Sequence, residues 1–435
     1  MRHTNRTIFL FWLPLAATWA MMALEGPFLA AVIARLADPK FNLAAYGVAF
    51  AFAILVEAPV IMLMSAATAL VEDSESYRRL RNFTGGLNLL ATAMLLVVLA
   101  PGVYTRLMVG MIGLPTEVAE LTHGALWILL PWPAAIGYRR FLQGLLIRSG
   151  RTRLVAMGTV IRLAAMAAVA TALFVLTDLP GAWVGAAALS TAVCAEALAA
   201  HFMAAPTVRE LKAMPQAAGN RLGYRDIVAF YYPLALTSFL ALAVQPMLTF
   251  FMGRSPSPIE SLAVFPVVNS LSFVFRSMGM SFQEAVIALI GKNHEHYPEL
   301  ARFGTILGLA STGGLALVAF TPLSSFWFET LSGLTPDLAA FAFVPTMVLV
   351  PLPALTVLLT LQRGVLMQGR RTRPVTLATA TEVAVIASVF AVSAWGAGLV
   401  GVTAATVAFA MGRTASNVLL SRFTGPLLRA AGHAR

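Results

Sequence analysis

Eleven charged residues lie within long apolar stretches of this 435-residue chain. If these stretches cross a membrane, a charge near the bilayer centre costs about 2.5–3.5 kcal/mol, so it normally faces a partner or water. Guanidinium groups bind carboxylate or phosphate through paired hydrogen bonds, and a desolvated carboxylate can bind a proton or Na⁺. The eleven residues are Glu25, Glu57, Arg139, Arg140, Arg162, Glu196, Arg276, Glu284, Arg363, Glu382 and Arg413.

Some of these charges have an ordinary explanation. Arg139, Arg140, Glu284 and Arg363 lie near predicted helix ends, where side chains can extend to the membrane surface, and that interpretation stays open for each of them. Arg162 and Glu382 lie in the inner third of their helices, so the same explanation applies to them in part.

Two mid-helix charges occupy equivalent positions in the two halves of the chain. Glu57 and Arg276 are as far apart in the sequence as Phe11 and Phe230, which begin the two copies of an internal repeat described below; we call this separation the repeat offset. We hypothesise that Glu57 and Arg276 form, or alternate with, an ion pair between the halves that substrate or a proton disrupts. The alternative is that each pairs within its own half, because buried ions are normally paired. Opposite charges also recur at Arg162/Glu382 and, approximately, at Glu196/Arg413.

Two prolines predict helix kinks beside polar side chains. Glu25 precedes Pro27 by two residues, and Gln245 directly precedes Pro246. Proline removes a helix hydrogen bond and leaves a carbonyl group without its donor. We therefore expect Glu25, beside such a carbonyl group, to be a candidate proton or Na⁺ site, although a purely structural kink is an equal alternative.

The composition indicates a polytopic helical membrane protein. Hydrophobic residues make up 59% of the chain and charged residues only 11%, whereas a soluble domain is about a quarter charged. This excludes an ordinary soluble enzyme. A span needs about 20 apolar residues. Twelve spans are predicted, at Ile8–Arg35, Leu43–Val71, Phe83–Tyr104, Val118–Ile147, Leu154–Thr177, Trp183–Ala204, Ile227–Met252, Ile259–Ile290, Ala301–Phe328, Ala339–Met367, Pro374–Trp395 and Leu399–Leu420.

The positions of the basic residues predict the orientation. With a cytoplasmic N-terminus, twenty of the 30 Lys and Arg residues fall in inner segments and four in outer ones. Positive residues favour the inner side, so both termini are expected in the cytoplasm. The net charge of +11 is then explained by insertion and by anionic membrane lipid, without a nucleic-acid partner.

An internal repeat relates the two halves. The segments starting at Phe11 and Phe230 are identical at eight of 25 positions, including two prolines and a terminal arginine. Six spans per half give both halves the same orientation, so they should be related by a pseudo-twofold axis along the membrane normal. We expect two parallel six-helix lobes, at 1–205 and 227–422, a cytoplasmic linker at 206–226 and a cytoplasmic tail at 423–435.

No motif for a cofactor or catalytic centre is found. The single cysteine, Cys194, excludes a disulfide framework and a cysteine metal site, and no phosphate-binding loop motif for ATP occurs. The histidines are not clustered for metal binding. We expect no enzyme activity, no metal and no cofactor, apart from coupling to H⁺ or Na⁺.

Short motifs in two loops resemble those of a known transporter superfamily. The loop after the fourth span contains Gln143-Gly144 and Gly150-Arg151-Thr152-Arg153, and the loop after the tenth contains Gln368-Gly369 and Arg371-Thr372-Arg373-Pro374. These resemble the turns of multidrug and toxic compound extrusion (MATE) transporters in their flippase superfamily. The major facilitator fold also has twelve helices, but its characteristic loop after the second helix is absent from EDSESYRRLRN.

Within that superfamily the chain is most similar to the progressive ankylosis (ANK) family. The likeness lies in Tyr232–Leu236 with Pro246 and Phe250–Arg254, in Ala45–Ala49, and in Glu260–Val264. The resemblance implies a twelve-helix exporter with a central cleft lined by helices 1, 2, 7 and 8. It also implies small-anion substrates such as citrate, pyrophosphate or nucleotides.

The arginines favour an anionic substrate, because a cleft for organic cations would need acidic and aromatic residues. The expected substrate-binding residues are Arg276, Gln245, Asn269, Arg140, Gln143 and Arg363, and the expected coupling or gating residues are Glu25, Glu57, Glu196 and Arg413.

We therefore expect a monomeric exporter of the bacterial inner membrane that works by alternating access. Its substrate would be a small organic or phosphate-bearing anion. The alternatives are a proton- or Na⁺-coupled multidrug antiporter for organic cations, a lipid-linked saccharide flippase, and an intramembrane enzyme, for which no catalytic arrangement is identified.

Overall fold

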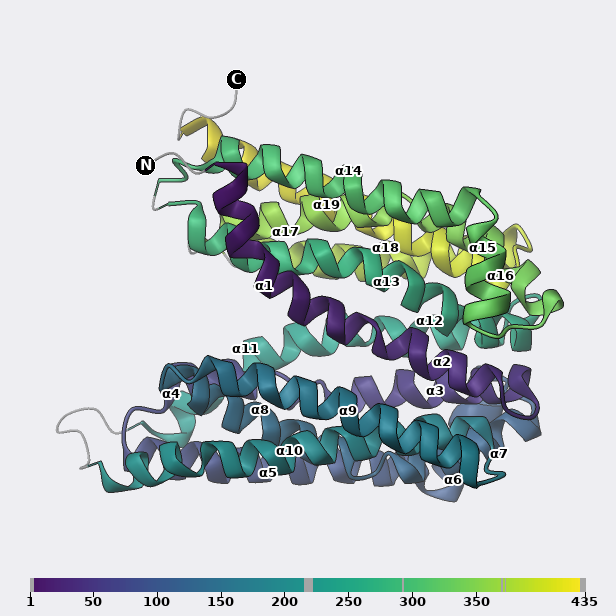
Figure 1. The fold of residues 1–435 in the computed structure, drawn as a ribbon, viewed down its shortest axis with the longest axis horizontal. Coiled ribbons are helices and arrows are strands. Elements are labelled where there is room, and N and C mark those ends of the chain that lie inside the picture. Colours follow the sequence, from purple (N-terminus) through teal and green to yellow (C-terminus); the bar gives the residue numbers. More distant parts are fainter. Residues whose placement is uncertain (1–3, 215–221, 292, 369–370, 372, 431–435) are drawn as a thin grey trace. The chain divides into compact units, whose positions relative to one another are not determined.

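The computed structural model describes residues 4–214, 222–291, 293–368, 371 and 373–430, and every regular element in them is helical. Within these residues, nine helices are long and apolar enough to cross a membrane, and the bent pair α16 (Pro336–Leu349) and α17 (Leu352–Gln368) makes a tenth. Each of the twelve predicted spans corresponds to one helix or to helices joined at a break (Figure 1). The protein is a multi-pass membrane protein.

The chain forms two compact units. Residues 36–250 make the unit we call the N-unit, and residues 1–35 join 251–435 in the C-unit. The first span thus groups with the second half of the chain, and most of the seventh groups with the first half. These units differ from the predicted lobes by the exchange of those two spans. The predicted division at 1–205 and 227–422 stays a prediction for the lobes that move.

The N-unit is built around α10, which packs against α9, α8, α7 and α3. Its elements in chain order are α3 (Pro39–Glu57), α4 (Leu63–Leu70), α5 (Ser74–Leu99), α6 (Pro101–Thr105), η1 (Arg106–Ile112), α7 (Thr116–Ile128), α8 (Trp132–Arg148), α9 (Thr152–Leu176), α10 (Gly181–Ala213), α11 (Tyr224–Leu242) and most of α12 (Val244–Gly253).

The C-unit has α13 at its centre, in contact with the broken first span on one side and with α17 on the other. The first span packs against α13, which α1 crosses at an angle in Figure 1. The elements are α1 (Asn5–Ala23), α2 (Glu25–Ala34), α13 (Pro258–Leu289), α14 (Tyr297–Phe320), α15 (Leu323–Ser325), η2 (Phe326–Leu331), α16, α17, α18 (Arg373–Phe390), η3 (Ala391–Gly396) and α19 (Gly401–Ala430).

The internal repeat is visible in the backbone. The first span breaks at Leu24 and the seventh at Ala243, positions related by the repeat offset, so both kinks predicted from Pro27 and Pro246 are confirmed. Asp38 and Ser257 are related by the same offset and have left-handed conformations with φ of 48° and 52°. Each precedes the proline that begins the next helix. Equivalent loops thus start the second and eighth spans.

The second span is not the continuous helix predicted over Leu43–Val71. It ends at Glu57, turns, and resumes at Leu63. Pro59 lies in this turn and has no N–H group to continue the helix hydrogen bonds. The eighth span, α13, is continuous over the equivalent residues. The helix break therefore places Glu57, but not its counterpart Arg276, at a helix end.

Close packing of the second span on the fourth, and of the eighth on the tenth, follows one pattern with exchanged residues. A Cβ atom on Gly137 would overlap Oδ1 of Asn88 and lie 3.0 Å from Cβ of Val60, and one on Gly279 would lie 2.9 Å from Cγ2 of Val357. Gly137 is equivalent to Val357, and Val60 to Gly279, in the repeat. Each contact thus combines one glycine with one valine, although Asn88 also packs against Gly137 and the backbone of Val357 against Gly279.

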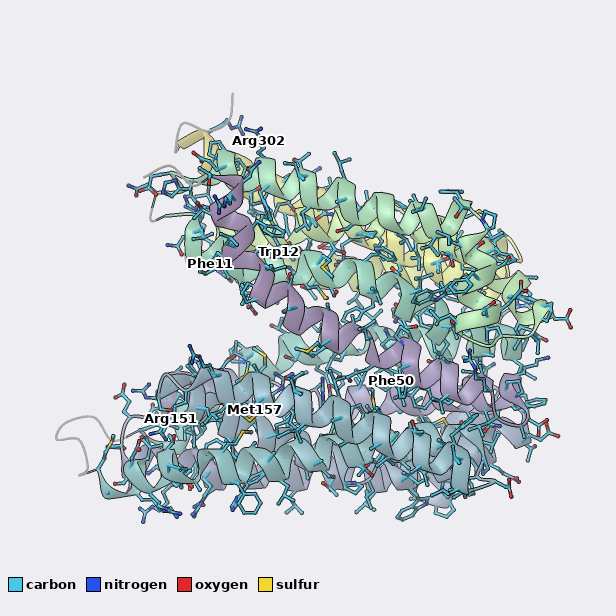
Figure 2. The ribbon with its side chains drawn as sticks, viewed as in Figure 1. Phe11, Trp12, Phe50, Arg151, Met157 and Arg302 are labelled. Atoms are coloured by element: carbon cyan, nitrogen blue, oxygen red, sulfur yellow. The ribbon has the colours of Figure 1, made fainter. Side chains whose placement is uncertain are left out.

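Two helices extend beyond their predicted spans. Helix α10 continues through Pro206 to Ala213, so the first part of the predicted linker 206–226 is helical, and residues 215–221 lie outside the described residues. Arg151 holds this extension through Thr207 at 2.9 Å and Glu210 at 2.7 Å; its position is labelled in Figure 2. Likewise α19 runs to Ala430, so the predicted tail 423–435 begins as helix.

Candidate functional site

A buried carboxylate organises the charges of the N-unit. Glu196 on α10 has no solvent exposure and forms ion pairs with Arg139 on α8 and, at 3.5 Å, with Arg162 on α9. Gln143 donates from Nε2 to the same carboxylate at 3.0 Å. Glu196 thus forms ion pairs with two guanidinium groups and accepts a hydrogen bond from one amide. Arg139 does not extend to the membrane surface, the alternative left open by the sequence, because its side chain is buried in this network.

Glu57 and Arg140 complete this cluster without joining the ion-pair network. Glu57 is 7% exposed, and its Oε2 atom has no hydrogen-bond partner in the described residues. The charges that act on its carboxylate are those of Arg140, Arg139 and Arg162. Arg140 is half-buried and contacts Sδ of Met64 at 3.9 Å. No ion pair of Arg140 is found in the described part of the chain.

An aromatic stack aligns the two helices that carry these charges. Phe50 on α3, labelled in Figure 2, stacks on Trp132 on α8 with ring centroids 5.9 Å apart and planes 25° apart. Glu57 follows Phe50 by seven residues, and Arg139 follows Trp132 by seven, which is close to two helical turns. The stack therefore fixes how α3 and α8 face each other about two turns before Glu57 and Arg139.

The C-unit cluster repeats the arrangement with opposite signs. Glu382 on α18 accepts a hydrogen bond at 2.8 Å from Nε of Arg413 on α19 and lies 2.8 Å from its Nη2. Arg413 also donates to Oγ1 of Thr356 at 3.1 Å. In the N-unit the corresponding helices carry Arg162 and Glu196. Both halves thus join their fifth and sixth spans by a buried ion pair, with the charges reversed.

Two further arginines of the C-unit have no carboxylate of their own. Arg276 on α13 is 5% exposed, and its Cζ atom lies 4.9 Å from the ring centroid of Phe409. Arg363 on α17 donates to Oγ1 of Thr379 at 3.1 Å. Neither arginine has an ion pair within the described residues, and the Nε atom of each is buried without a hydrogen-bond partner. The carboxylate that acts on both is Glu382, which Arg413 already occupies.

The remaining expected residues lie near the helix breaks or on α13. Glu25 is the first residue of α2 after the break at Leu24, and Gln245 is the second residue of α12 after the break at Ala243. Asn269 is half-buried on α13, seven residues before Arg276 and so on the same helical face.

The ten expected residues therefore separate into groups. Glu196, Gln143 and Arg413 belong to ion-pair networks inside one unit, whereas Arg140, Arg276 and Arg363 have no ion pair in the described residues. Glu57 and Arg276 belong to different units, and each has charged neighbours in its own unit. The hypothesised ion pair between the halves stays a prediction.

Sequence reasoning missed the structural partners of these residues. Thr356 and Thr379 bind Arg413 and Arg363, and neither threonine was singled out. Helical spacing offered a signal for Thr379, which precedes Glu382 by three residues and so lies on the same face of α18.

No family model matches the sequence, and no curated protein matches it. The fold is nevertheless shared with solved membrane transporters. An inward-facing multidrug resistance MATE family transporter of the MOP superfamily matches with a TM-score of 0.69 and 12% identity, over 95% of both chains. The lipid II flippase MurJ, in an inward closed conformation, matches with a TM-score of 0.71 and 14% identity, over 95% of this chain and 87% of that one.

A third similar structure is a MOP superfamily transporter from Pyrococcus furiosus Vc1, described as having a binding pocket of reverse polarity that suggests a different function. It has a TM-score of 0.65 and 13% identity over 99% of this chain and 97% of that one. At these identities the comparisons establish the fold. They confirm the predicted class, a helical polytopic membrane protein of the MATE-like, two-lobe, twelve-helix type.

Proposed function

We propose that this protein is a secondary transporter that moves a small organic or phosphate-bearing anion by alternating access of two lobes. The shared fold supports a transporter, because the similar structures named above are transporters and a flippase. The loop motifs and the resemblance to the ANK family support export of small anions. A site in the bacterial inner membrane, cytoplasmic termini and a monomeric state are parts of the same proposal.

The anionic substrate rests on one contrast among buried and half-buried arginines. Arg139 and Arg162 share an ion pair with Glu196 and Arg413 pairs with Glu382, whereas Arg140, Arg276 and Arg363 have no ion pair in the described residues. A guanidinium group inside a membrane protein is costly when uncompensated. A carboxylate or phosphate ligand would compensate it through paired hydrogen bonds.

Glu57 is the proposed coupling or gating residue. Its carboxylate belongs to the N-unit cluster but lies outside the Glu196 ion-pair network of the described residues. When ionised it competes with an anionic substrate for the positive charge of Arg140. When it binds a proton, that charge becomes available, so proton and anion binding favour each other. Glu25 is a second candidate, because it lies at the helix break of the first span.

The direct test uses purified protein in liposomes. Uptake of radiolabelled citrate and pyrophosphate would be measured beside uptake of a cationic dye. We expect anion uptake that falls about tenfold or more in Arg276→Gln, Arg363→Gln and Arg140→Gln, because each removes a charge-assisted hydrogen bond. Arg78→Gln is the control, since Arg78 is exposed and pairs with Glu75 on the same helix.

Three outcomes would contradict the proposal. Dye transport without anion transport would favour a multidrug antiporter. Flipping of a lipid-linked saccharide with no uptake of free anion would favour a flippase. Anion uptake that is equal in the wild type and in all three arginine variants would show that these residues do not bind the substrate.

A further inference from the structure

Two buried aromatic side chains occupy equivalent positions in the first and seventh spans. Trp12 on α1 is 6% exposed and Tyr231 on α11 is 3% exposed, and they are related by the repeat offset. Figure 2 labels Trp12 on the first span. Each has one hydrogen-bond donor at its polar end. Burying such a donor without an acceptor in a membrane protein would be costly, so the acceptor should matter.

The acceptors are also equivalent. The Tyr231 hydroxyl donates to the carbonyl oxygen of Pro59 at 2.5 Å, and the Trp12 indole N–H reaches the carbonyl oxygen of Met278 at 3.3 Å. Pro59 and Met278 are again related by the repeat offset. Trp12 donates in addition to Oγ of Ser281 at 2.8 Å, and that hydroxyl donates to the Met278 carbonyl. In both halves, therefore, the aromatic side chain donates to a backbone carbonyl group at an equivalent position.

A third equivalent element holds each ring. Tyr231 meets Phe83 edge to face, with centroids 5.3 Å apart and planes at 77°. Trp12 meets Phe303 in the same way, at 5.8 Å and 67°. The separation of Phe83 and Phe303 exceeds the repeat offset by a single position. Donor, acceptor and ring partner therefore all recur in the two halves, although tryptophan and tyrosine differ in shape.

The contact at Pro59 has a clear local reason. Pro59 lies in the break between α3 and α4, where the N–H of Leu63 donates to Val60 instead of continuing the helical pattern. Among the described residues, the Tyr231 hydroxyl is the donor that reaches the Pro59 carbonyl. A hydrogen bond from the seventh span thus holds the second span where its helical hydrogen bonds are interrupted.

Each contact lies beside one of the mid-helix charges. Pro59 follows Glu57 by two residues, and Met278 follows Arg276 by two. On a helix two residues correspond to about 200°, so a contact at Met278 holds the face opposite Arg276 and fixes the rotation of α13 about its axis. At Pro59 the contact fixes the turn that ends the helix carrying Glu57.

We propose that Trp12 and Tyr231 are paired positioning residues: Trp12 orients the α13 segment that presents Arg276, and Tyr231 orients the broken segment that presents Glu57. This inference rests on the proposed function for its consequence and on the contacts above for its geometry. Trp12 lies on the first span of the first repeat but packs in the C-unit with Arg276. Tyr231 lies on the first span of the second repeat but packs in the N-unit with Glu57. Each charge cluster therefore contacts a helix that belongs to the other repeat.

The geometry is tested by hydrogen exchange measured by mass spectrometry, without any assay of transport. Tyr231→Phe removes only the hydroxyl, and we expect amides of residues 58–63 to exchange about fivefold faster, the effect of one net hydrogen bond, while 277–283 stay unchanged. Trp12→Phe should speed the exchange of 277–283 and leave that of 58–63 unchanged. Ser281→Ala is the milder second variant for that contact, and Tyr232→Phe, on a 64% exposed neighbour, is the control.

A transport assay separates positioning from simple structural support. We expect Trp12→Phe to raise the KM for the anion with kcat largely retained, because Arg276 is displaced. We expect Tyr231→Phe to shift the pH midpoint of transport, because Glu57 is displaced. A merely structural role would lower kcat and thermal stability in both variants without either specific change.

The outcomes distinguish this inference from the proposed function. Unchanged exchange in both segments, or equal exchange changes in both segments for each variant, would overturn the paired positioning. Altered exchange in the expected segments, in a protein that transports no anion, would support the positioning geometry and contradict the proposed function. If the protein transports anions, but Trp12→Phe and Tyr231→Phe show the exchange and kinetics of the Tyr232→Phe control, the proposed function is supported and the positioning role is contradicted.

Discussion

Glu382 binds Arg413 through two atoms of the guanidinium group, Nε and Nη2, each 2.8 Å from the same carboxylate oxygen. This contact commits the carboxylate that acts on Arg276 and Arg363. The C-unit cluster contains three arginines and one carboxylate, so it has excess positive charge. Pairing decides that Arg413 is compensated and that this excess falls on Arg276 and Arg363.

Removing one partner of this buried pair should be strongly destabilising. Glu382→Gln leaves Arg413 buried without its carboxylate, and we expect the free energy of unfolding to fall by about 3–5 kcal/mol. The double variant Glu382→Gln/Arg413→Gln removes both charges and should recover much of that loss. Thermal unfolding followed by circular dichroism in detergent measures both. A double variant less stable than Glu382→Gln would contradict the pairing.

Arg276 should behave differently from Arg413. Since Arg276 has no ion pair in the described residues, Arg276→Gln removes an uncompensated buried charge and should leave stability unchanged or raised, while anion uptake falls about tenfold or more. Arg413→Gln should lower stability, because Glu382 is then left alone. The same unfolding experiment, with uptake measured in parallel, compares the two. Equal loss of stability in both variants would show that Arg276 is structural.

Anion transport should depend on pH through Glu57. The charged groups acting on this carboxylate are Arg140, Arg139 and Arg162, and Tyr231 contacts the adjoining turn. An ionised Glu57 competes with the substrate for Arg140, so uptake by the wild type should fall as pH rises.

Glu57→Gln imitates the protonated state and should keep uptake at its low-pH level throughout. Uptake into liposomes across a pH series measures this, with the exposed Glu117→Gln as control. A Glu57→Gln variant with the pH curve of the wild type would exclude Glu57 as the coupling group.

The glycine–valine exchange between the halves predicts a compensating pair. Gly279→Val places side-chain atoms against Val357 and should destabilise the protein by about 1–3 kcal/mol. Adding Val357→Gly removes the contact with Cγ2 of Val357 but leaves the backbone N and Cα of that residue 3.0 and 3.3 Å from the new Cβ, so it should restore part of that stability. Melting temperatures of the two single variants and the double variant test this. No recovery in the double variant would show that the two contacts are not equivalent.

The sequence by itself determined the helical membrane class, the repeat and the two proline kinks of the first and seventh spans. Each is a local property, since span length, hydropathy and the missing N–H of proline act within one segment. It also identified the charges within the spans as candidate functional residues, because an ionised side chain within an apolar run is rare for a physical reason. The repeat offset also relates Glu57 to Arg276.

Only the tertiary structure decided which charges neutralise one another. Glu196 lies far along the chain from Arg139 and Arg162, and no spacing rule selects it over Glu57 as their partner. The same holds for the grouping of the first span with residues 251–435 and for the contacts of Trp12 and Tyr231. These features depend on which helix faces meet, and that depends on packing among distant segments, because side-chain fit and charge pairing are settled jointly when the helices assemble.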